Sequence, residues 1–279
     1  MIEASDGRRR ARILMMAYAC SPWRGSEAGA GWHTAVEAAR YCDTWVICEG
    51  ATFEGEIRRY IHEHGSPRGL RFVYLPEKRW AGPAWRIPGA GYLSYNLWQR
   101  RALRLARGLH EEVGFDLVHH VNIIGFREPG YLWKLGVPFV WGPVGGTQNH
   151  PWSFLTEADL GGALLEAVRN VANRMQFRLS RKVRRACRAA DVIIAANSAG
   201  QVDFASFHGV ASILMSELGV REVCSGRMQR PLDDHLRILW SGSLITRKAL
   251  SLLIRALAQL PGDISYELRV VGDGPLRAR

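Results

Sequence analysis

The sequence predicts an α/β protein built around doubly wound parallel sheets. Short apolar runs alternate with amphipathic helical stretches along almost the whole chain. Those runs lack alternating polar residues, as strands buried on both faces require. Loops that contain glycine or proline follow several of the runs. These three observations predict one Rossmann-like domain, followed by the start of a second.

The chain opens with a strand–helix–strand unit. Residues 13–19 are continuously apolar and are followed by Ser21 and Pro22. A glycine loop over residues 25–31 then leads into an alanine-rich helix from Gly31 to about residue 40. The next apolar run, residues 44–48, predicts a second strand. This order is the βαβ unit of a parallel sheet.

The same alternation continues to about residue 220. Helices are expected over 54–63, 92–112 and 160–189, and strands over 70–75, 116–120, 137–141, 191–196 and 212–215. Residues 1–220 therefore form the predicted N-terminal Rossmann-like domain.

A second domain is expected after a polar linker over residues 221–234. Residues 235–279 contain a strand at 236–241, a helix at 247–260 and a strand at 266–271. Two strands and one helix cannot bury both faces of a parallel sheet, so we expect the natural chain to continue beyond Arg279.

Composition limits the partners and the compartment. The formal net charge of +11 favours anionic partners: nucleotide diphosphates, acidic lipid surfaces or nucleic acid. Nucleic acid ranks last, because the sequence has no recognised nucleic-acid module. The five scattered cysteines lack the paired spacing of zinc or redox sites, so we expect no metal. No apolar run approaches the roughly 20 residues that span a bilayer, and we expect a cytoplasmic protein.

Two glycine-bearing loops follow predicted strands. Gly29 and Gly31 precede the first helix, where backbone N–H groups and the helix dipole favour an anion. Glu27 suits a sugar hydroxyl there better than an anion. Gly145 and Gly146 follow a later strand and are expected to leave backbone N–H groups uncovered. A simple tight turn explains each loop equally well.

Two histidines close the strand at residues 116–120. Neighbouring strand residues point to opposite sheet faces, so at most one of His119 and His120 reaches a ligand. We assign His119 to the site, with a structural role as the alternative.

Cations gather at two places. Lys248 follows the first strand of the second domain and is placed to reach a diphosphate, with Arg247 as the other candidate. A solvated surface lysine is the alternative. The stretch from Arg174 to Arg188 is rich in arginine and predicts a basic amphipathic helix. It favours contact with an anionic membrane, or a solvated helix whose arginines pair with carboxylates.

The order and spacing of these segments carry a family resemblance. The segments are ILMMAYACSPWRGSEAGAGWHTAVEAAR, FDLVHHVNIIGFREPGYLWKLGVPFVWGPVGG, RILWSGSLITRKALSLLIRAL and LRVVGDGP. Together they resemble the retaining glycosyltransferases of family four. These enzymes have the GT-B architecture, in which two Rossmann-like domains face each other and the N-terminal domain lies on the acceptor side.

The resemblance implies transfer of a hexosyl group from a UDP- or GDP-sugar to a hydroxyl, with retention and without a bound cofactor or metal. The implied acceptor is a glycan, a lipid-linked sugar or a small molecule, as in polysaccharide biosynthesis at the inner face of a membrane. Gly31 matches a glycine whose amide approaches the donor diphosphate. Lys248 matches the lysine that neutralises it, His119 matches a strand-end histidine, and Gly274 lies in the matching donor-side loop.

The chain departs from the family pattern at three places. No histidine occupies residues 144–146, where many members of the family have one. Ser243 stands where the family has an arginine that binds the diphosphate, and we expect Arg247 to supply the missing positive charge. The Glu-x7-Glu segment that holds the donor would lie beyond Arg279, so we expect this chain alone to catalyse poorly. Two alternatives remain: a non-catalytic binding module, and a dinucleotide-dependent oxidoreductase or epimerase in which Glu49 would bind the ribose.

Overall fold

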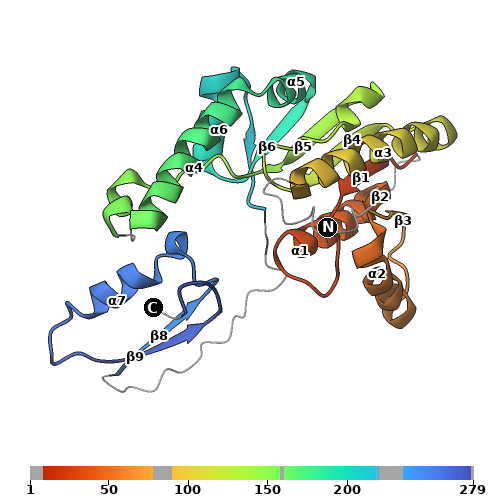
Figure 1. Cartoon of the computed structure of the whole chain (residues 1–279). Coiled ribbons are helices and arrows are strands. Elements are labelled where there is room, and N and C mark those ends of the chain that lie inside the picture. Colours follow the sequence, from red (N-terminus) through yellow and green to blue (C-terminus); the bar gives the residue numbers. More distant parts are fainter. Residues whose placement is uncertain (1–8, 78–89, 158–159, 218, 220–234, 278–279) are drawn as a thin grey trace. The chain divides into compact units, whose positions relative to one another are not determined.

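A computed structural model provides the structure of the protein, and it describes residues 9–77, 90–157, 160–217, 219 and 235–277. Contacts divide the chain into two compact units (Figure 1). Unit 1 combines Met1–Gln148 with Met175–Gly219, and unit 2 combines Asn149–Arg174 with Val220–Arg279. The expected linker at 221–234 lies outside the described residues.

Unit 1 contains a seven-stranded parallel sheet in the order β3-β2-β1-β4-β5-β6-β7. The strands are β1 (Arg12–Ala17), β2 (Asp43–Glu49), β3 (Leu70–Leu75), β4 (Leu117–Asn122), β5 (Phe139–Val144), β6 (Val192–Ala195) and β7 (Ile213–Leu214). The chain reverses its direction of winding between β1 and β4, as in a Rossmann sheet. The predicted doubly wound α/β fold is confirmed.

Helices connect the successive strands of this sheet. They are α1 (Ser26–Tyr41), α2 (Gly50–His64), α3 (Ala90–Val113), α4 (Leu160–Leu179), α5 (Arg181–Ala189) and α6 (Ser198–His208), with short 3₁₀ helices η2 (Leu132–Leu135) and η3 (Trp152–Glu157). Of these, η3 and the part of α4 up to Arg174 belong to unit 2. The sequence did not predict α6, although Asn197 caps its start by accepting a hydrogen bond from the Gly200 N–H at 2.8 Å.

The single helix expected over 160–189 is two helices. Ser180 has an extended backbone, and its hydroxyl accepts a hydrogen bond from the Val183 N–H at 3.4 Å, which starts α5. A serine in this position competes with the helix backbone for hydrogen bonds, which is why the helix breaks here.

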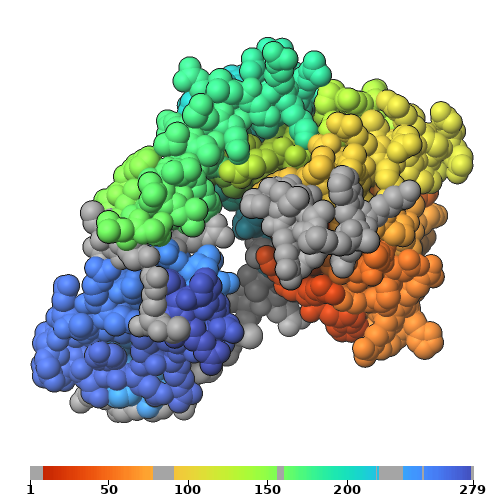
Figure 2. Space-filling model, in the orientation of Figure 1, coloured from red at the N-terminus to blue at the C-terminus, as the bar shows by residue number. Residues whose placement is uncertain are grey.

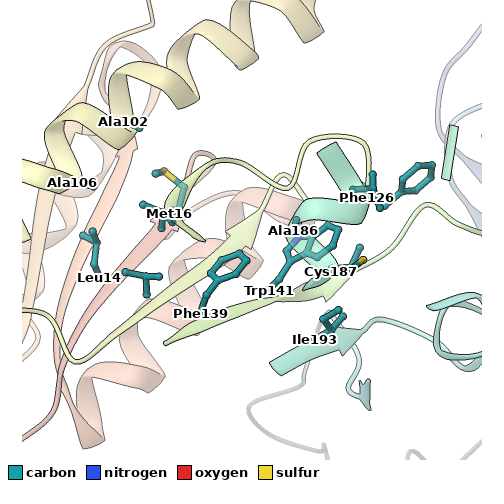
Figure 3. Close-up of a cluster of buried hydrophobic side chains, with 14 of the residues drawn as sticks. Leu14, Met16, Ala102, Ala106, Phe126, Phe139, Trp141, Ala186, Cys187 and Ile193 are labelled. Carbon is teal, nitrogen blue, oxygen red and sulfur yellow. The ribbon is translucent and has the colours of Figure 1, made fainter. Parts of the chain in front are cut away.

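Alternate residues of β1 pack on opposite faces of the sheet. Leu14 and Met16 belong to a core cluster that includes Ala102 and Ala106 of α3 (Figure 3). Met15 and neighbouring residues belong to a second cluster with α1 and α2. The central strand is therefore covered by helices on both sides, which accounts for its unbroken apolar sequence.

Unit 2 contains one βαβ unit. Strands β8 (His235–Ser241) and β9 (Ser265–Val271) pair in parallel, and η4 (Thr246–Lys248) and α7 (Leu250–Leu257) connect them. The predicted order of elements is confirmed, but the expected helix over 247–260 is a 3₁₀ turn followed by a shorter α-helix.

The cysteines of the described chain are free thiols. Cys20, Cys48 and Cys187 are buried and Cys42 is half-buried, while Cys224 lies outside the described residues. Within the described ranges, no helix combines the length and hydropathy needed to cross a bilayer. Nor do the described residues bring together three side chains of the types that bind metals.

Candidate functional site

The connection from β1 to α1 contains the first predicted glycine site. The expectation of a loop over residues 25–31 was wrong, because α1 already begins at Ser26. Gly29 and Gly31 therefore lie in its first two turns. Their weak helix propensity is tolerated here because both residues are buried against the rest of unit 1.

The start of α1 has no side-chain cap. Gly25 is the extended N-cap residue, and Ser26 follows with a positive φ of 54°. The first N–H groups of any helix lack partners within it, and the helix dipole makes this end favourable for anions. This helix start is therefore suited to an anionic ligand such as a phosphate.

Gly31 is required by close packing. A Cβ atom at this position would collide with the Ala19 carbonyl oxygen and would lie 2.8 Å from Asn122 Nδ2. Helix α1 can approach the ends of β1 and β4 this closely only with glycine at this point. Contact of the Gly31 amide with a diphosphate stays a prediction.

Asn122 joins three segments at the end of β4. Its buried side chain donates to the carbonyl oxygens of Ala19 at 2.7 Å and Glu27 at 2.9 Å, and accepts from the Ala19 N–H at 3.1 Å. The role of Asn122 was not predicted from the sequence. An amide side chain directly after an apolar strand was the signal available.

Glu27 points from the first turn of α1 toward the same place. Its Oε1 accepts a hydrogen bond from the Ile124 N–H at 3.2 Å. Burial raises the pKa of Glu27 above its ordinary value, as does the nearby charge of Glu217, although the bond from Ile124 opposes them. A partly desolvated carboxyl of this kind can exchange hydrogen bonds with a sugar hydroxyl.

The two strand-end histidines have different surroundings. His119 Nε2 lies 2.7 Å from the Gly142 carbonyl oxygen of β5, and burial lowers the pKa of this imidazole. A neutral ring therefore donates this hydrogen bond. His120 is almost completely buried, and burial followed by the effect of His119 lowers its pKa to about 3. Participation of His119 in the site stays a prediction.

The loop after β5 differs from expectation at Gly145. Its N–H donates to the Ile124 carbonyl at 2.9 Å, and its carbonyl accepts from the Phe126 N–H at 3.2 Å. The prediction of an uncovered Gly145 N–H was wrong, because the loop after β4 pairs with this segment in parallel fashion. Gly146 is exposed with φ of 79°, a conformation that favours glycine.

The donor-side residues of the prediction lie in unit 2. Lys248 is exposed in η4, between β8 and α7. Gly274 has φ of 157°, and a Cβ there would lie 2.6 Å from the Leu244 carbonyl oxygen. The Leu244 N–H donates to the Asp273 carbonyl at 2.9 Å, so the loops after the two strands are joined. The Arg247 side chain lies outside the described part of the chain.

The helix start in unit 2 resembles the one in unit 1, but here the positive-φ residue is the N-cap and not the first helical residue. Ala249 precedes α7 with a positive φ of 55°, and it provides no side-chain cap. Lys248 stands directly before it. A helix terminus without a cap and an adjacent cation together favour an anionic ligand.

Glu49 lies at the end of β2, where a dinucleotide-binding Rossmann domain has its ribose-binding acid. Both of its carboxylate oxygens are occupied: Oε1 accepts from the Ala51 and Glu77 N–H groups, and Oε2 from the Thr52 N–H. Burial opposes ionisation, but these hydrogen bonds hold the pKa of Glu49 below its ordinary value. Glu49 is therefore a helix cap, which weakens the dinucleotide alternative.

Several solved structures similar to this chain are glycosyltransferases. The lipopolysaccharide outer core galactosyltransferase WaaB is 11% identical, with a TM-score of 0.49 over 95% of this chain and 61% of its own. Arabidopsis thaliana UGT89C1, complexed with UDP-L-rhamnose, is 9% identical, with a TM-score of 0.47 over 96% of this chain and 70% of its own. Glycyrrhiza uralensis UGT73P12 is 13% identical, with a TM-score of 0.41 over 75% of this chain and 48% of its own.

The chain thus spans 61% of WaaB and 48% of UGT73P12. A comparison of the sequence with protein-family models finds no match, and no curated protein matches it either. At TM-scores below 0.5 the three likenesses carry no weight for function.

In unit 1 the structure brings Glu27, Gly31, Asn122 and Gly145 together at the carboxyl edge of the sheet. His119 is joined to the neighbouring strand β5. Lys248 and Gly274 occupy the corresponding edge of the two-stranded sheet of unit 2.

Proposed function

We propose that this chain is part of a GT-B glycosyltransferase that transfers a hexosyl group from a nucleoside diphosphate sugar to a hydroxyl, with retention of configuration. The observation that carries the proposal is the shared design of the first βα connection in each unit. Neither helix has a side-chain cap, and each has a positive-φ residue at its start: Ser26 is the first residue of α1, and Ala249 is the N-cap residue of α7. Both helix ends are suited to anions.

The chemistry follows from charge developing on the leaving group. When the glycosidic bond to the donor breaks, negative charge grows on the departing diphosphate. Backbone N–H groups at a helix start and the Lys248 ammonium stabilise that charge electrostatically, without a metal or an organic cofactor. Ser243 supplies no cation at the position where related enzymes carry an arginine, so Lys248 has the larger share of this role.

The acceptor is assigned to unit 1. Glu27, with its raised pKa, is placed to hydrogen-bond an acceptor hydroxyl. His119 lies on β4, and its neutral ring is engaged with Gly142. The proposed acceptor is a glycan, a lipid-linked sugar or a small molecule that offers a hydroxyl.

Donor binding provides the direct test. Lys248→Ala is expected to weaken binding of UDP or GDP by about 1–3 kcal/mol, the scale of a charge-assisted contact. Isothermal titration with each nucleotide measures the change and identifies the base. Lys134→Ala, which removes an exposed lysine of unit 1, is the matched control. Equal affinities for the two variants would remove Lys248 from the site.

Retention is tested separately. The anomeric configuration of the first-formed product is read by NMR after transfer from the donor that binds. An axial linkage from an axial donor supports the proposal, and an inverted product contradicts it.

A further inference from the structure

Apart from Phe177, which is buried in the hydrophobic core, helix α4 buries polar residues and exposes apolar ones. Glu166, Asn170 and Asn173 are 7%, 2% and 3% exposed. The opposite side carries six large apolar residues, each between 51% and 67% exposed: Leu164, Leu165, Val168, Val171, Met175 and Leu179. These six residues are called the α4 apolar face. A surface helix of a globular protein normally has the reverse orientation.

Hydrogen bonds fix this orientation. The Asn170 side chain accepts from the His150 N–H at 2.9 Å and donates to the His150 carbonyl at 2.7 Å. Asn173 Nδ2 donates to Asn149 Oδ1 at 3.0 Å. Turning the helix to bury its apolar face would remove all three bonds and leave buried polar groups without partners.

The α4 apolar face is bordered by positive charge. Residues 167–190 contain seven arginines and one lysine but no aspartate or glutamate. With 3.6 residues per turn, Arg174 and Arg178 fall along one margin of the face. In the following helix α5, the apolar residues Val183, Ala186 and Cys187 are buried. Its four arginines are exposed: Arg181, Arg184, Arg185 and Arg188.

If this basic stretch were simply a solvent-exposed helix, its arginines would be expected to pair with carboxylates of the protein. Among the described residues, Lys182 pairs with Glu128 and Arg169 pairs with Glu166. The exposed arginines of α5 and Arg178 form no ion pair with described residues, so their charge remains available to a partner.

We propose that α4 binds the surface of an anionic membrane, with the α4 apolar face entering the boundary between headgroups and acyl chains. A 20-residue helix is about 30 Å long, and helices of this type enter the interface to a depth of about 5–10 Å. The arginine stems extend along the apolar surface while their guanidinium groups reach lipid phosphates. Exposed Trp152 and Phe154, which precede α4, are side chains favoured at such interfaces.

Charge complementarity favours lipid over a second copy of the chain. A second copy would bring the same uncompensated arginines to the contact, whereas an anionic bilayer neutralises them. The part of the surface formed by α4 is drawn in green in the space-filling view (Figure 2). A chain held on a bilayer would meet lipid-linked acceptors, and that consequence alone rests on the proposed function.

Flotation of this chain with vesicles tests the proposal without turnover, so its outcome is independent of the proposed transfer reaction. The chain is expected to float with vesicles of phosphatidylcholine and phosphatidylglycerol. Phosphatidylcholine alone should retain it at least about tenfold less well. Equal binding to both, or no binding to the anionic vesicles, would overturn the proposal.

Two matched pairs of variants locate the contact. Val168→Glu should lower the vesicle partition coefficient at least about tenfold, whereas Val202→Glu should not. Both valines lie in helices and are similarly exposed, at 59% and 62%. The double variant Arg178→Gln with Arg181→Gln should lower the vesicle partition coefficient roughly fivefold for each arginine removed. The same change at the exposed Arg104 and Arg107 of α3 is the control.

Circular dichroism melting of each variant shows that the fold is retained. Equal vesicle binding by the Val168 and Val202 variants would contradict the proposal. Light scattering of the lipid-free chain tests whether the α4 apolar face instead binds a second copy of the chain. A dimer that Val168→Glu dissociates, in a chain that does not bind vesicles, would assign this face to self-association. That result would overturn membrane binding.

Discussion

The first βα connections of the two units begin alike and are packed differently. Both come after a strand, and neither helix has a side-chain cap. Each has a positive-φ residue at its start, Ser26 as the first residue of α1 and Ala249 as the N-cap residue of α7. Leu14 and Met15 of β1 are fully buried. Leu236 and Leu239 of β8 remain 48% and 70% exposed. The same local motif therefore stands in a closed core in one unit and in a partly covered sheet in the other.

The difference has a simple physical origin. Strand β1 pairs with β2 and β4, and two hydrophobic clusters cover its two faces. In the described part of unit 2, β8 pairs with β9, and one short helix connects them. Local geometry at a helix start is determined by neighbouring residues, but burial depends on how many layers are packed around the strand.

The largest expected effect comes from a matched pair of leucines. Leu14→Ala should lower the free energy of unfolding by about 2–5 kcal/mol, because it leaves a cavity in the closed core. Leu239→Ala should change it by less than about 0.5 kcal/mol, because that side chain is mostly exposed. Urea unfolding followed by tryptophan fluorescence measures both. A cost at Leu239 as large as at Leu14 would show that β8 is covered in solution.

A pair of helical glycines tests the close approach of α1. Gly31→Ala should destabilise the protein by about 1–3 kcal/mol, since the added methyl group meets backbone and Asn122 atoms. Gly55→Ala in α2 meets nothing within 4 Å and should stabilise it by about 0.5–1 kcal/mol. Thermal melts of the two variants compare them directly. Equal, small shifts would mean that α1 packs more loosely than described.

Acid should destabilise unit 1 through His120. The pKa of this histidine falls from 6.5 to about 3 in the folded protein, with burial as the main cause. The unfolded chain therefore takes up the proton first, so this contribution is fully present above pH 6.5 and is lost as the pH falls toward 3. Stability should fall by up to about 1.4 kcal/mol per pH unit in that window.

Urea midpoints at several pH values measure this slope. His120→Leu should flatten it, whereas His235→Gln, at a half-exposed histidine of unit 2, should leave it unchanged. An unaltered slope in the His120 variant would assign acid sensitivity to other groups.

The smallest expected effects have opposite signs in the two units. Burial raises the pKa of Glu27, so its ionisation costs stability once the pH exceeds the ordinary value of 4.5. Glu27→Gln should then stabilise the folded protein at neutral pH by less than about 1 kcal/mol, because solvent screens a half-buried group, and should have no effect in acid.

The Arg269 guanidinium lowers the pKa of Glu267 in unit 2. Glu267→Gln should therefore slightly destabilise at neutral pH, an effect that is lost as the pH falls. Melting curves at pH 7 and pH 4 test both signs.

Much of the fold was predictable because its signals are local. Apolar runs located every strand of the seven-stranded sheet to within a few residues, and helical periodicity located α2 and α3. Errors occurred where a side chain that accepts a hydrogen bond from a backbone N–H group decided where a helix begins. The cap at Ser180 divided one expected helix, and the missed α6 depended on a cap by Asn197.

The candidate site was predictable only in part. Its position at the carboxyl edge follows from the parallel order of the strands, and the glycines near it were recognised. The role of Asn122 was not, and neither was the bond between Glu27 and Ile124, because these partners lie about a hundred residues apart in sequence. The expected free N–H of Gly145 is instead bonded to Ile124.

By itself, the sequence determined the order of strands and helices, the positive charge of residues 174–188 and the glycines beside the sheet edge, because periodicity, charge and backbone freedom belong to the residues themselves. Only the tertiary structure decided that α4 buries its asparagines and exposes its leucines, that Asn122 links β4 to α1, and that β1 is enclosed while β8 is not. Each of these depends on partners distant in the chain, and amphipathic periodicity specifies that a helix has two faces without specifying which face is covered.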